Sequence, residues 1–429
     1  MENSIFKKEY KLKQHTMLLH FQAKPSSGEN VCLRASEVKP KLDRFILKKL
    51  GEIKTVKEKY SSWIQAEHLN EKDVAFKYRM TIKTDKPEFI EPNRIPKIYY
   101  GNLNKLDPDK LHAVMFPNGV ALTITCFIPD LKKFIEENIA EFFAVTNFGT
   151  MQNKGFGSFT IEGIDEETVS VDEETVIVAL KNNYDSKKCF KVAVNQSGYD
   201  NETQNTLFET VKQVYSVMKS GQNIPRYPDK YIRSFIYVYM HDKGIGNEKA
   251  FMKATEVAPL RDTHGDPLCQ DHEDALQKKL KDEQFRYVRA VLGIADKIEW
   301  FESDEEQKEQ RRRSPLRERV AIEHLPTDDE LKIERCSSPV FFKIINGIIY
   351  FTADNVNPYV FGKKFSFTNE GYTTKDNPPP ESAPEYGKDC TLYTPKNFEM
   401  ADFLTKYMGY YNNNINKFRR NLRFPIEEV

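Results

Sequence analysis

The feature that most constrains this chain is a glycine-rich segment placed between a helical pattern and an alternating strand pattern. Residues 147–159 have the sequence NFGTMQNKGFGSF, which contains three glycines and one lysine. Glycine permits positive φ angles and the close approach of another backbone, and successive amides in such a turn can bind an anion. The segment therefore predicts either a loop that binds a phosphate backbone, with Lys154 adding charge, or a plain helix end at Gly149 followed by a bulged strand entry.

Two common nucleotide-binding motifs are excluded for this segment. No Gly-Lys-Ser/Thr follows a glycine and four variable residues, so it is not a P-loop. The dinucleotide fingerprint runs from a strand into a helix, whereas this segment runs from a helix into a strand.

The composition predicts a folded chain that is neutral overall. The chain has 429 residues, of which 39% are hydrophobic, and its 64 basic side chains balance 64 acidic ones. This length suggests two or three domains, or one large fold with insertions. A protein that binds nucleic acid over its whole surface is usually basic, so any such contact here must use a local stripe of charge.

The cysteines and the apolar runs predict a soluble cytoplasmic protein with no membrane partner. The six cysteines are scattered and form no CxxC pair, which is typical of reduced thiols. The first residues, MENSIFKKEYKLKQ, lack an apolar signal region, and no run of eighteen apolar residues exists.

Hydrophobic periodicity in the first half gives the order strand, helix, strand, strand, helix, strand. The predicted strands are 9–23, 73–85, 118–127 and 156–163, and the predicted helices are 34–50 and 129–146. This order is the ferredoxin-like βαββαβ arrangement. We therefore predict an α+β fold of ferredoxin-like (RRM-like) modules with large insertions. Residues 1–200 would form the first domain, and 201–429 a second, degenerate module with a charged insertion near 255–335.

Other segments have weaker patterns. Residues 168–180 alternate and predict a hairpin, and Asn346-Gly347 predicts the turn of another hairpin within 338–355. Residues 206–218 and 397–423 predict helices.

Four separated pieces of the sequence resemble the RAMP superfamily, the ferredoxin-like RNA-binding subunits of CRISPR effector complexes. They occur in the family's order: Leu33–Phe45, the Lys154–Phe159 part of the glycine loop (residues 147–159), Val291–Ala295 and Arg335–Lys343. The last piece is similar to a Ser-Pro-hydrophobic-Lys strand of the Cmr-type head subunit in type III complexes. The resemblance implies an RNA-binding subunit of a type III ribonucleoprotein in antiviral defence, without a cofactor. Its partners would be guide RNA, target single-stranded RNA as a second ligand, and other effector subunits.

The resemblance and the charges together predict an RNA-binding track. Phosphate is favoured at a helix N-terminus, and the start of the first predicted helix carries Arg34, Ser36, Lys39, Lys41 and Arg44. Lys154, Gly155 and Gly157 would let the RNA backbone approach from the glycine loop. The alternative for the helix charges is an ordinary solvated face, and Asp43 is expected to pair with Lys39, four residues before it.

Two other functions stay open. One is a metal-independent guide-processing endoribonuclease that uses His15 or His20. The other is a structural assembly protein whose glycine loop packs on a neighbouring subunit.

The remaining chemistry-bearing residues are assigned more plainly. His264, Cys269 and His272 predict a surface loop rather than a zinc site, because no fourth ligand is obvious. Arg311-Arg312-Arg313 either contact RNA or balance the acidic residues before them. Candidates for stacking on bases are Tyr99, Tyr100, Phe156 and Phe159, with a core position favoured for Phe159.

Overall fold

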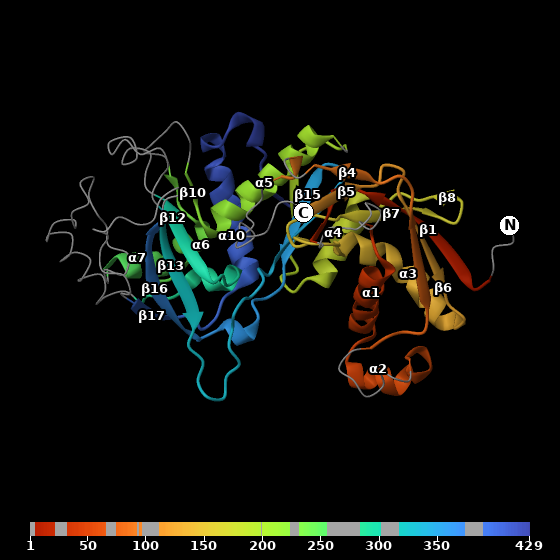
Figure 1. Cartoon of the computed structure of the whole chain (residues 1–429), viewed down its shortest axis with the longest axis horizontal. Coiled ribbons are helices and arrows are strands. Elements are labelled where there is room, and N and C mark those ends of the chain that lie inside the picture. Colours follow the sequence, from red (N-terminus) through yellow and green to blue (C-terminus); the bar gives the residue numbers. More distant parts are fainter. Residues whose placement is uncertain are drawn as a thin grey trace. The chain divides into compact units, whose positions relative to one another are not determined.

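The chain folds into two compact units (Figure 1). The computed structural model describes residues 5–21, 32–65, 74–91, 94–96, 111–198, 200–223, 231–254, 284–301, 317–373 and 389–429. The first unit comprises Met1–Lys212, Phe341–Ala353 and Phe424–Val429, and the second comprises Gln213–Val340 and Asp354–Arg423. The predicted α+β class is confirmed, since antiparallel sheets and helices build both units.

The main sheet of the first unit has the strand order β3-β6-β1-β7-β8 with antiparallel neighbours. Its strands are β1 (Lys7–Gln14), β3 (Arg79–Thr84), β6 (Val120–Thr125), β7 (Phe159–Ile164) and β8 (Glu167–Thr168). Helix α1 (Ala35–Leu50) lies between β1 and β3 in the sequence, and α3 (Pro129–Val145) lies between β6 and β7. The order strand, helix, strand, strand, helix, strand is therefore present in the main sheet and its two helices.

The first predicted strand, 9–23, is two strands in the structure. After β1 the chain turns and enters β2 (Leu18–Phe21), which pairs with β5 (Leu111–Met115) and β4 (Glu88–Ile90) in a separate sheet. The buried Gln14 side chain donates to the Thr16 and Val114 carbonyls, and its oxygen accepts from Phe116 N at 2.7 Å. A buried amide with these partners fixes the break between the two strands. Between α1 and β3 lie α2 (Ile53–Lys59) and η1 (Ser61–Trp63).

The two helices cover one face of the main sheet. Tyr10 and Leu12 of β1 are buried, whereas Lys7, Glu9 and Lys11, at the odd-numbered positions, are exposed. This alternation places apolar side chains of the sheet on the helix side and polar ones on the opposite side. In the core between sheet and helices, Phe142 of α3 contacts the rings of Phe45, Phe143 and Phe148.

A third sheet of the order β14-β15-β9-β18 completes the first unit. Its strands are β14 (Val340–Ile345), β15 (Ile348–Ala353), β9 (Phe190–Ala193) and β18 (Glu427–Glu428). The predicted hairpin turn is confirmed, since Asn346 and Gly347 join β14 to β15 with φ angles of 48° and 80°. Positive φ at both positions is the two-residue hairpin geometry that Asn-Gly favours.

The predicted hairpin at 168–180 is wrong. After the short β8, residues Glu173–Asn183 form helix α4. Asp172 accepts a hydrogen bond from Thr175 N at 2.6 Å and so caps the helix. The buried residues Val176, Ala179 and Leu180 have helical spacing, and this spacing outweighs the local alternation of valines.

The second unit has a sheet of the order β12-β13-β16-β17. Its strands are β12 (Lys297–Phe301), β13 (Arg317–His324), β16 (Lys364–Thr373) and β17 (Asp389–Tyr393). Its other elements are β10 (Gln222–Asn223), β11 (Tyr231–Ile232), α6 (Phe235–His241), α7 (Glu248–Ala254), η6 (Val288–Leu292), η7 (Pro358–Val360), α10 (Met400–Asn413), η8 (Ile415–Lys417) and η9 (Arg420–Leu422). Helix α5 (Asn201–Lys219) begins in the first unit and ends in the second. Among the described helices, none is long and apolar enough to cross a membrane.

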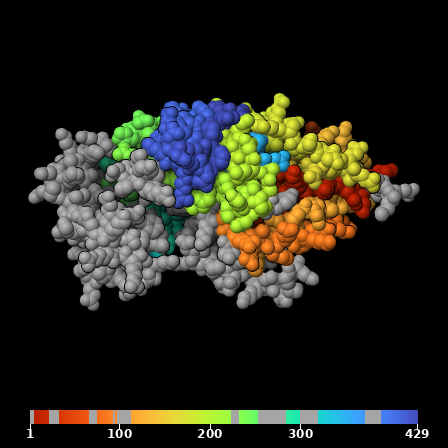
Figure 2. Space-filling view, turned by 90° about the horizontal axis from the view of Figure 1, so that it is seen from above, coloured from red at the N-terminus to blue at the C-terminus, as the bar shows by residue number. Residues whose placement is uncertain are grey.

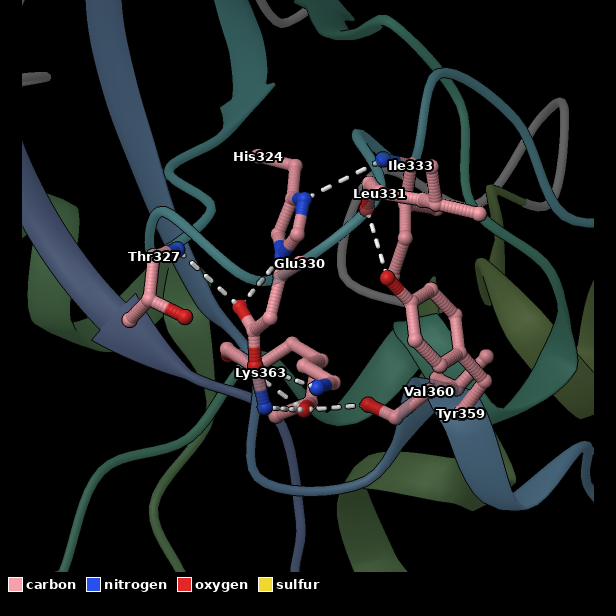
Figure 3. A network of polar contacts seen from close by, with 9 residues as sticks. His324, Thr327, Glu330, Leu331, Ile333, Tyr359, Val360 and Lys363 are labelled. Atoms are coloured by element: carbon pink, nitrogen blue, oxygen red, sulfur yellow. Dashed lines mark hydrogen bonds and ion pairs between the residues drawn. The ribbon is translucent and has the colours of Figure 1, made fainter.

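A polar network fixes the loop that leaves β13 (Figure 3). The buried His324 accepts a hydrogen bond from Ile333 N at 3.1 Å through Nδ1. Glu330 accepts from Thr327 N at 3.2 Å and pairs with Lys363 at 2.5 Å. The loop is thereby tied both to its own strand and to the residue before β16.

Candidate nucleic-acid interface

The start of α1 and the glycine loop lie against each other, as the predicted track requires. Lys41 Nζ donates to the Asn147 carbonyl at 2.9 Å and to Gln152 Oε1 at 2.7 Å. Glu37 accepts from Gly149 N at 2.6 Å and pairs with Lys41 at 3.0 Å. These contacts join the first turns of the helix to the first half of the loop, residues 147–152.

The five predicted residues of α1 fall into two groups. Arg34, Ser36 and Arg44 are exposed, with Arg34 as the N-cap residue. Lys39 and Lys41 are only partly exposed, and their ammonium groups have protein partners.

The interpretation of Asp43 as the partner of Lys39 is confirmed. Lys39 Nζ lies 2.7 Å from Asp43 Oδ2, donates to the Phe76 carbonyl at 3.1 Å and sits 4.3 Å from the centre of the Tyr78 ring. Burial raises the pKa of Asp43, and the charge of Lys39 opposes that shift. Burial likewise lowers the pKa of Lys41, and the charge of Glu37 opposes that shift.

The three glycine amides of the loop donate to oxygens of the same unit. Gly149 N donates to the Glu37 carboxylate, Gly155 N to the Gln152 carbonyl at 3.1 Å, and Gly157 N to the Met17 carbonyl at 2.9 Å. The loop therefore uses these amides to pack on α1 and on the turn before β2. Contact of Lys154, Gly155 and Gly157 with RNA stays a prediction.

All three glycines have positive φ angles, and two of them show why glycine is required. At Gly157, with φ of 64°, a Cβ atom would collide with the Phe148 carbonyl. At Gly155, with φ of 88°, a Cβ atom would lie 2.9 Å from Ile344 Cδ1. The nearby Lys154 Nζ is buried, 5.6 Å from the centre of the Phe342 ring.

His15 is a buried structural residue. Its Nε2 lies 2.8 Å from Thr160 Oγ1, and its Nδ1 accepts from Asn346 N at 3.3 Å. Burial, with a smaller effect from the charge of Lys343, lowers the pKa of His15 to about 3. A ring in this state is neutral near pH 7 and has both nitrogens engaged, which does not suit general acid catalysis.

His20 belongs to a different sheet from Thr160, which contacts His15. It is half-buried in β2, directly opposite His112 of β5, and burial lowers its pKa. Thr160 and Asn346 engage both ring nitrogens of His15, so neither is left to pair with His20. Nor does any group of three or more His, Cys, Asp or Glu side chains in the described part of the chain have the arrangement of a metal site.

The predicted stacking residues that the structure describes are in the core. Phe156 is fully buried and stacks on Phe208 with ring centres 3.9 Å apart, so the prediction that it stacks on bases is wrong. The core position favoured for Phe159 is confirmed. Tyr99, Tyr100, His264, Cys269, His272 and Arg311–Arg313 lie outside the described residues.

One buried residue of the site was not recognised from the sequence as part of it. Lys343 of β14 donates to the carbonyls of Phe143 at 2.7 Å, Thr146 at 2.8 Å and Phe159 at 3.1 Å. It thereby joins the end of α3 to the strand that follows the glycine loop. The signal was a lone lysine in the apolar run VFFKII, because an ammonium group inside such a strand needs buried oxygen partners.

Comparisons with known proteins give one consistent relationship. The family model of the Cmr1 N-terminal domain matches residues 5–222, and that of the Cmr1 C-terminal domain matches residues 231–428. No curated protein matches the sequence.

Two solved structures are similar to this chain at low sequence identity. One is the crystal structure of Cmr1 from Pyrococcus furiosus in the apo form, with 10% identity over 99% of this chain and 98% of that chain and a TM-score of 0.37. The other is a chain of the cryo-EM structure of the Type III-B Cmr-beta bound to cognate target RNA. That match has 18% identity and a TM-score of 0.26, and it covers 38% of this chain and 61% of the other, less than two thirds of its length.

Proposed function

The chain belongs to the Cmr1 family, and from this premise we propose that it is an RNA-binding subunit of a type III CRISPR effector complex in antiviral defence. The observation that carries the proposal is the match of both Cmr1 domain models, which together span nearly the whole chain. The partners are guide RNA, target single-stranded RNA and the other subunits of the complex. The place of action is the cytoplasm.

The proposed fold of the first unit is a ferredoxin-like module with insertions. Its support is the strand order β7-β1-β6-β3 with α1 and α3 as the two connections, which is the order expected of a split βαββαβ unit. Residues 201–429 are proposed to carry the second domain, a degenerate module of the same kind, with Phe341–Ala353 and Phe424–Val429 returning to the first unit.

The proposed RNA contacts are Arg34, Ser36, Lys39, Lys41 and Arg44 on α1, with Lys154, Gly155 and Gly157 on the loop. Arg34, Ser36 and Arg44 are the exposed members, so they contact phosphate directly in this proposal. The ion pairs of Lys39 and Lys41 keep the helix and the loop together beside them.

A binding assay tests this proposal. Fluorescein-labelled single-stranded RNA is titrated with the intact chain at several salt concentrations. Each phosphate contact to a single strand contributes about 0.7 to the slope of log K against log salt. The Arg34→Gln/Arg44→Gln variant should therefore bind more weakly and lose about 1.4 from the slope.

The matched control removes two charges elsewhere on the same unit. Lys54 and Lys59 are exposed on α2, and the Lys54→Gln/Lys59→Gln variant should keep both affinity and slope. If the wild-type chain binds no RNA, the proposed function fails. If the α1 variant matches the control, the proposed track fails.

The endoribonuclease alternative has its own test. The buried, neutral His15 argues for a non-catalytic subunit, so we expect repeat RNA to stay intact with the chain in EDTA. Cleavage that disappears in a His15→Ala/His20→Ala variant would support the alternative instead.

A further inference from the structure

The main sheet of the first unit has a second face that neither α1 nor α3 covers. The helices pack on the side that carries Tyr10, Leu12 and Leu122, all buried. On the other side, Lys7, Glu9 and Lys11 of β1 alternate with these buried positions and are exposed. The N-terminal segment reaches the molecular surface in Figure 2, where its atoms are red.

Cations occupy both sides of this open face, and small residues occupy its middle. The register aligns β3, β6 and β1 in three rows: Arg79–Thr125–Lys7, Thr81–Thr123–Glu9 and Lys83–Ala121–Lys11. Neighbouring strands are about 5 Å apart, so the cations of β3 and β1 flank a strip about 10 Å wide. The middle of the strip is formed by the threonine and alanine side chains of β6, which are small and leave the sheet accessible to a flat ligand.

The charge of the open face favours an anionic partner. Its strands β3, β1 and β7 carry five cations and two carboxylates: Arg79, Lys83, Lys7, Lys11 and Lys13 against Glu9 and Glu162. Lys11 pairs with Glu162 at 3.0 Å. Within the described part of the chain, Lys7, Arg79 and Lys83 form no ion pair, so three charges are available to a ligand.

An exposed aromatic pair lies at the end of β1 and β6 that carries Lys7 and Thr125. Phe6 and Phe127 are 42% and 68% exposed, and their ring centres are 5.1 Å apart. The backbone carbonyl of Phe6 accepts from Cys126 N at 2.9 Å, which extends the pairing of β1 and β6 by one step beyond Lys7 and Thr125. Phe127, the more exposed of the two, follows Thr125 by two residues and so continues β6 beyond that end of the strip.

An exposed ring at the end of the strip, the cations and the polar sheet surface match the chemistry of single-stranded nucleic acid. Bases stack on aromatic side chains while cations contact the phosphates. A protein partner is less well matched, because the centres of protein interfaces are depleted in lysine, and here Lys7, Lys11 and Lys83 lie at the edges of the strip. We propose that this open face is a second contact surface for single-stranded RNA, with a base on Phe127 and phosphates along Lys7, Arg79 and Lys83. The inference rests on the proposed function and adds a surface on the opposite face of the sheet from α1.

Two variants separate the stacking contact from the charge contacts. Phe127→Ala removes an exposed ring and should weaken binding of labelled single-stranded RNA about tenfold. Lys7→Gln/Arg79→Gln should lower the slope of log K against log salt by about 1.4. The Lys54→Gln/Lys59→Gln control should change neither quantity, and thermal melting checks that each variant folds.

A crosslink locates the contact. RNA that contains 4-thiouridine, irradiated with the wild-type chain, should attach to peptides that include Phe6 or Phe127. Unchanged affinity and slope in both open-face variants, with normal binding by the wild type, overturn this inference and leave the proposed function standing. Absence of any RNA binding by the wild type overturns both.

A protein interface is the other outcome that would overturn the proposal. If Phe127→Ala binds RNA normally but no longer joins the effector complex when coexpressed with the other subunits, the aromatic pair contacts protein and not RNA.

Discussion

At the scale of single residues, Lys343 is a charged group that the fold surrounds with backbone oxygens. Its side chain is fully buried, and the Phe143, Thr146 and Phe159 carbonyls accept its three hydrogen bonds. Burial lowers its pKa well below the ordinary value for lysine. The residue supplies donors to the C-terminal end of α3, where carbonyls lack partners within the helix.

Replacing Lys343 with methionine should destabilise the protein. The substitution leaves three buried carbonyls without a donor, and the relief of a buried charge offsets only part of that cost. We expect a loss of about 3 kcal/mol in the free energy of unfolding, measured by urea denaturation. Lys133→Met, at a lysine with 77% side-chain exposure on α3, is the control. Equal stability of the two variants would contradict the prediction.

His15 should make the protein less stable in mild acid. Its pKa is about 3 in the folded chain against 6.5 as the reference, so the unfolded chain takes up a proton first as the pH falls. The stability is therefore fully present above pH 6.5 and is lost between 6.5 and about 3. At pH 5 the loss from this group is about 2 kcal/mol.

The measurement is urea unfolding at pH 7, 6 and 5 for the wild type and His15→Gln. The variant should show the smaller decrease in stability over this range, whatever its stability at pH 7. His241→Gln, at an exposed histidine of α6, controls for the loss of one imidazole. A His15→Gln variant with the wild-type pH dependence would contradict the assignment.

At the scale of elements, alanine substitutions in the glycine loop distinguish a packing role of the loop from a ligand-binding role. Gly157→Ala should cost more than about 2 kcal/mol, because it adds left-handed strain to a collision with a backbone carbonyl. Gly155→Ala should cost less, since the contacted atom is the flexible end of Ile344. Gly51→Ala is the matched control, with φ of 110° and open space around it.

Thermal melting ranks the three variants, and RNA titration of the folded ones shows whether the loop binds. The order Gly157, Gly155, Gly51 in loss of stability is the expected result. If Gly155→Ala melts like Gly51→Ala but loses RNA affinity, the loop contacts RNA through its backbone as well as packing inside the unit.

Local patterns predicted those elements whose periodicity agrees with their burial. The helices at 34–50 and 129–146 and the turn at Asn346-Gly347 match the sequence patterns within a few residues. Residues 168–180 did not form the hairpin that their pattern predicted, because a capped helix with valines at alternating positions has the same local pattern as a strand. The break after Gln14 was also missed, because its amide bonds Val114, one hundred positions away.

The sequence predicted which segments of the candidate site come together, but not the hydrogen bonds between them. The sequence placed Lys41 and the glycine loop near each other, as the structure has them. It could not show that the glycine amides donate to Met17 and Gln152, since these bonds depend on how the loop folds back on β2. The alternation of Lys7, Glu9 and Lys11 with Tyr10 and Leu12 was visible in the sequence, and it is the signal for the open face.

At the scale of the whole molecule, the first unit is discontinuous in sequence. Its third sheet needs β14 and β15, which follow residue 339, beside β9 at Phe190–Ala193. Five of the six residues of β15 are buried, and β14 also contributes Lys343 and the oxygen of Ile344 that accepts from Ser158. The glycine loop also packs on β14, where Phe342 N donates to the Asn153 carbonyl at 3.1 Å.

A chain of residues 5–222 alone should therefore fail to fold cooperatively. Without β14 and β15 it exposes the apolar edge of β9 and leaves the carbonyls around Lys343 without their donor, and an unpaired apolar edge favours aggregation. Joining residues 338–354 to its end through a flexible Gly/Ser linker should restore a cooperative melting transition, followed by circular dichroism. The same joined chain with Phe342→Asp and Ile349→Asp should not melt cooperatively, because both side chains are fully buried. Cooperative melting of residues 5–222 by themselves would show that the returning hairpin is dispensable and that the first domain is continuous in sequence.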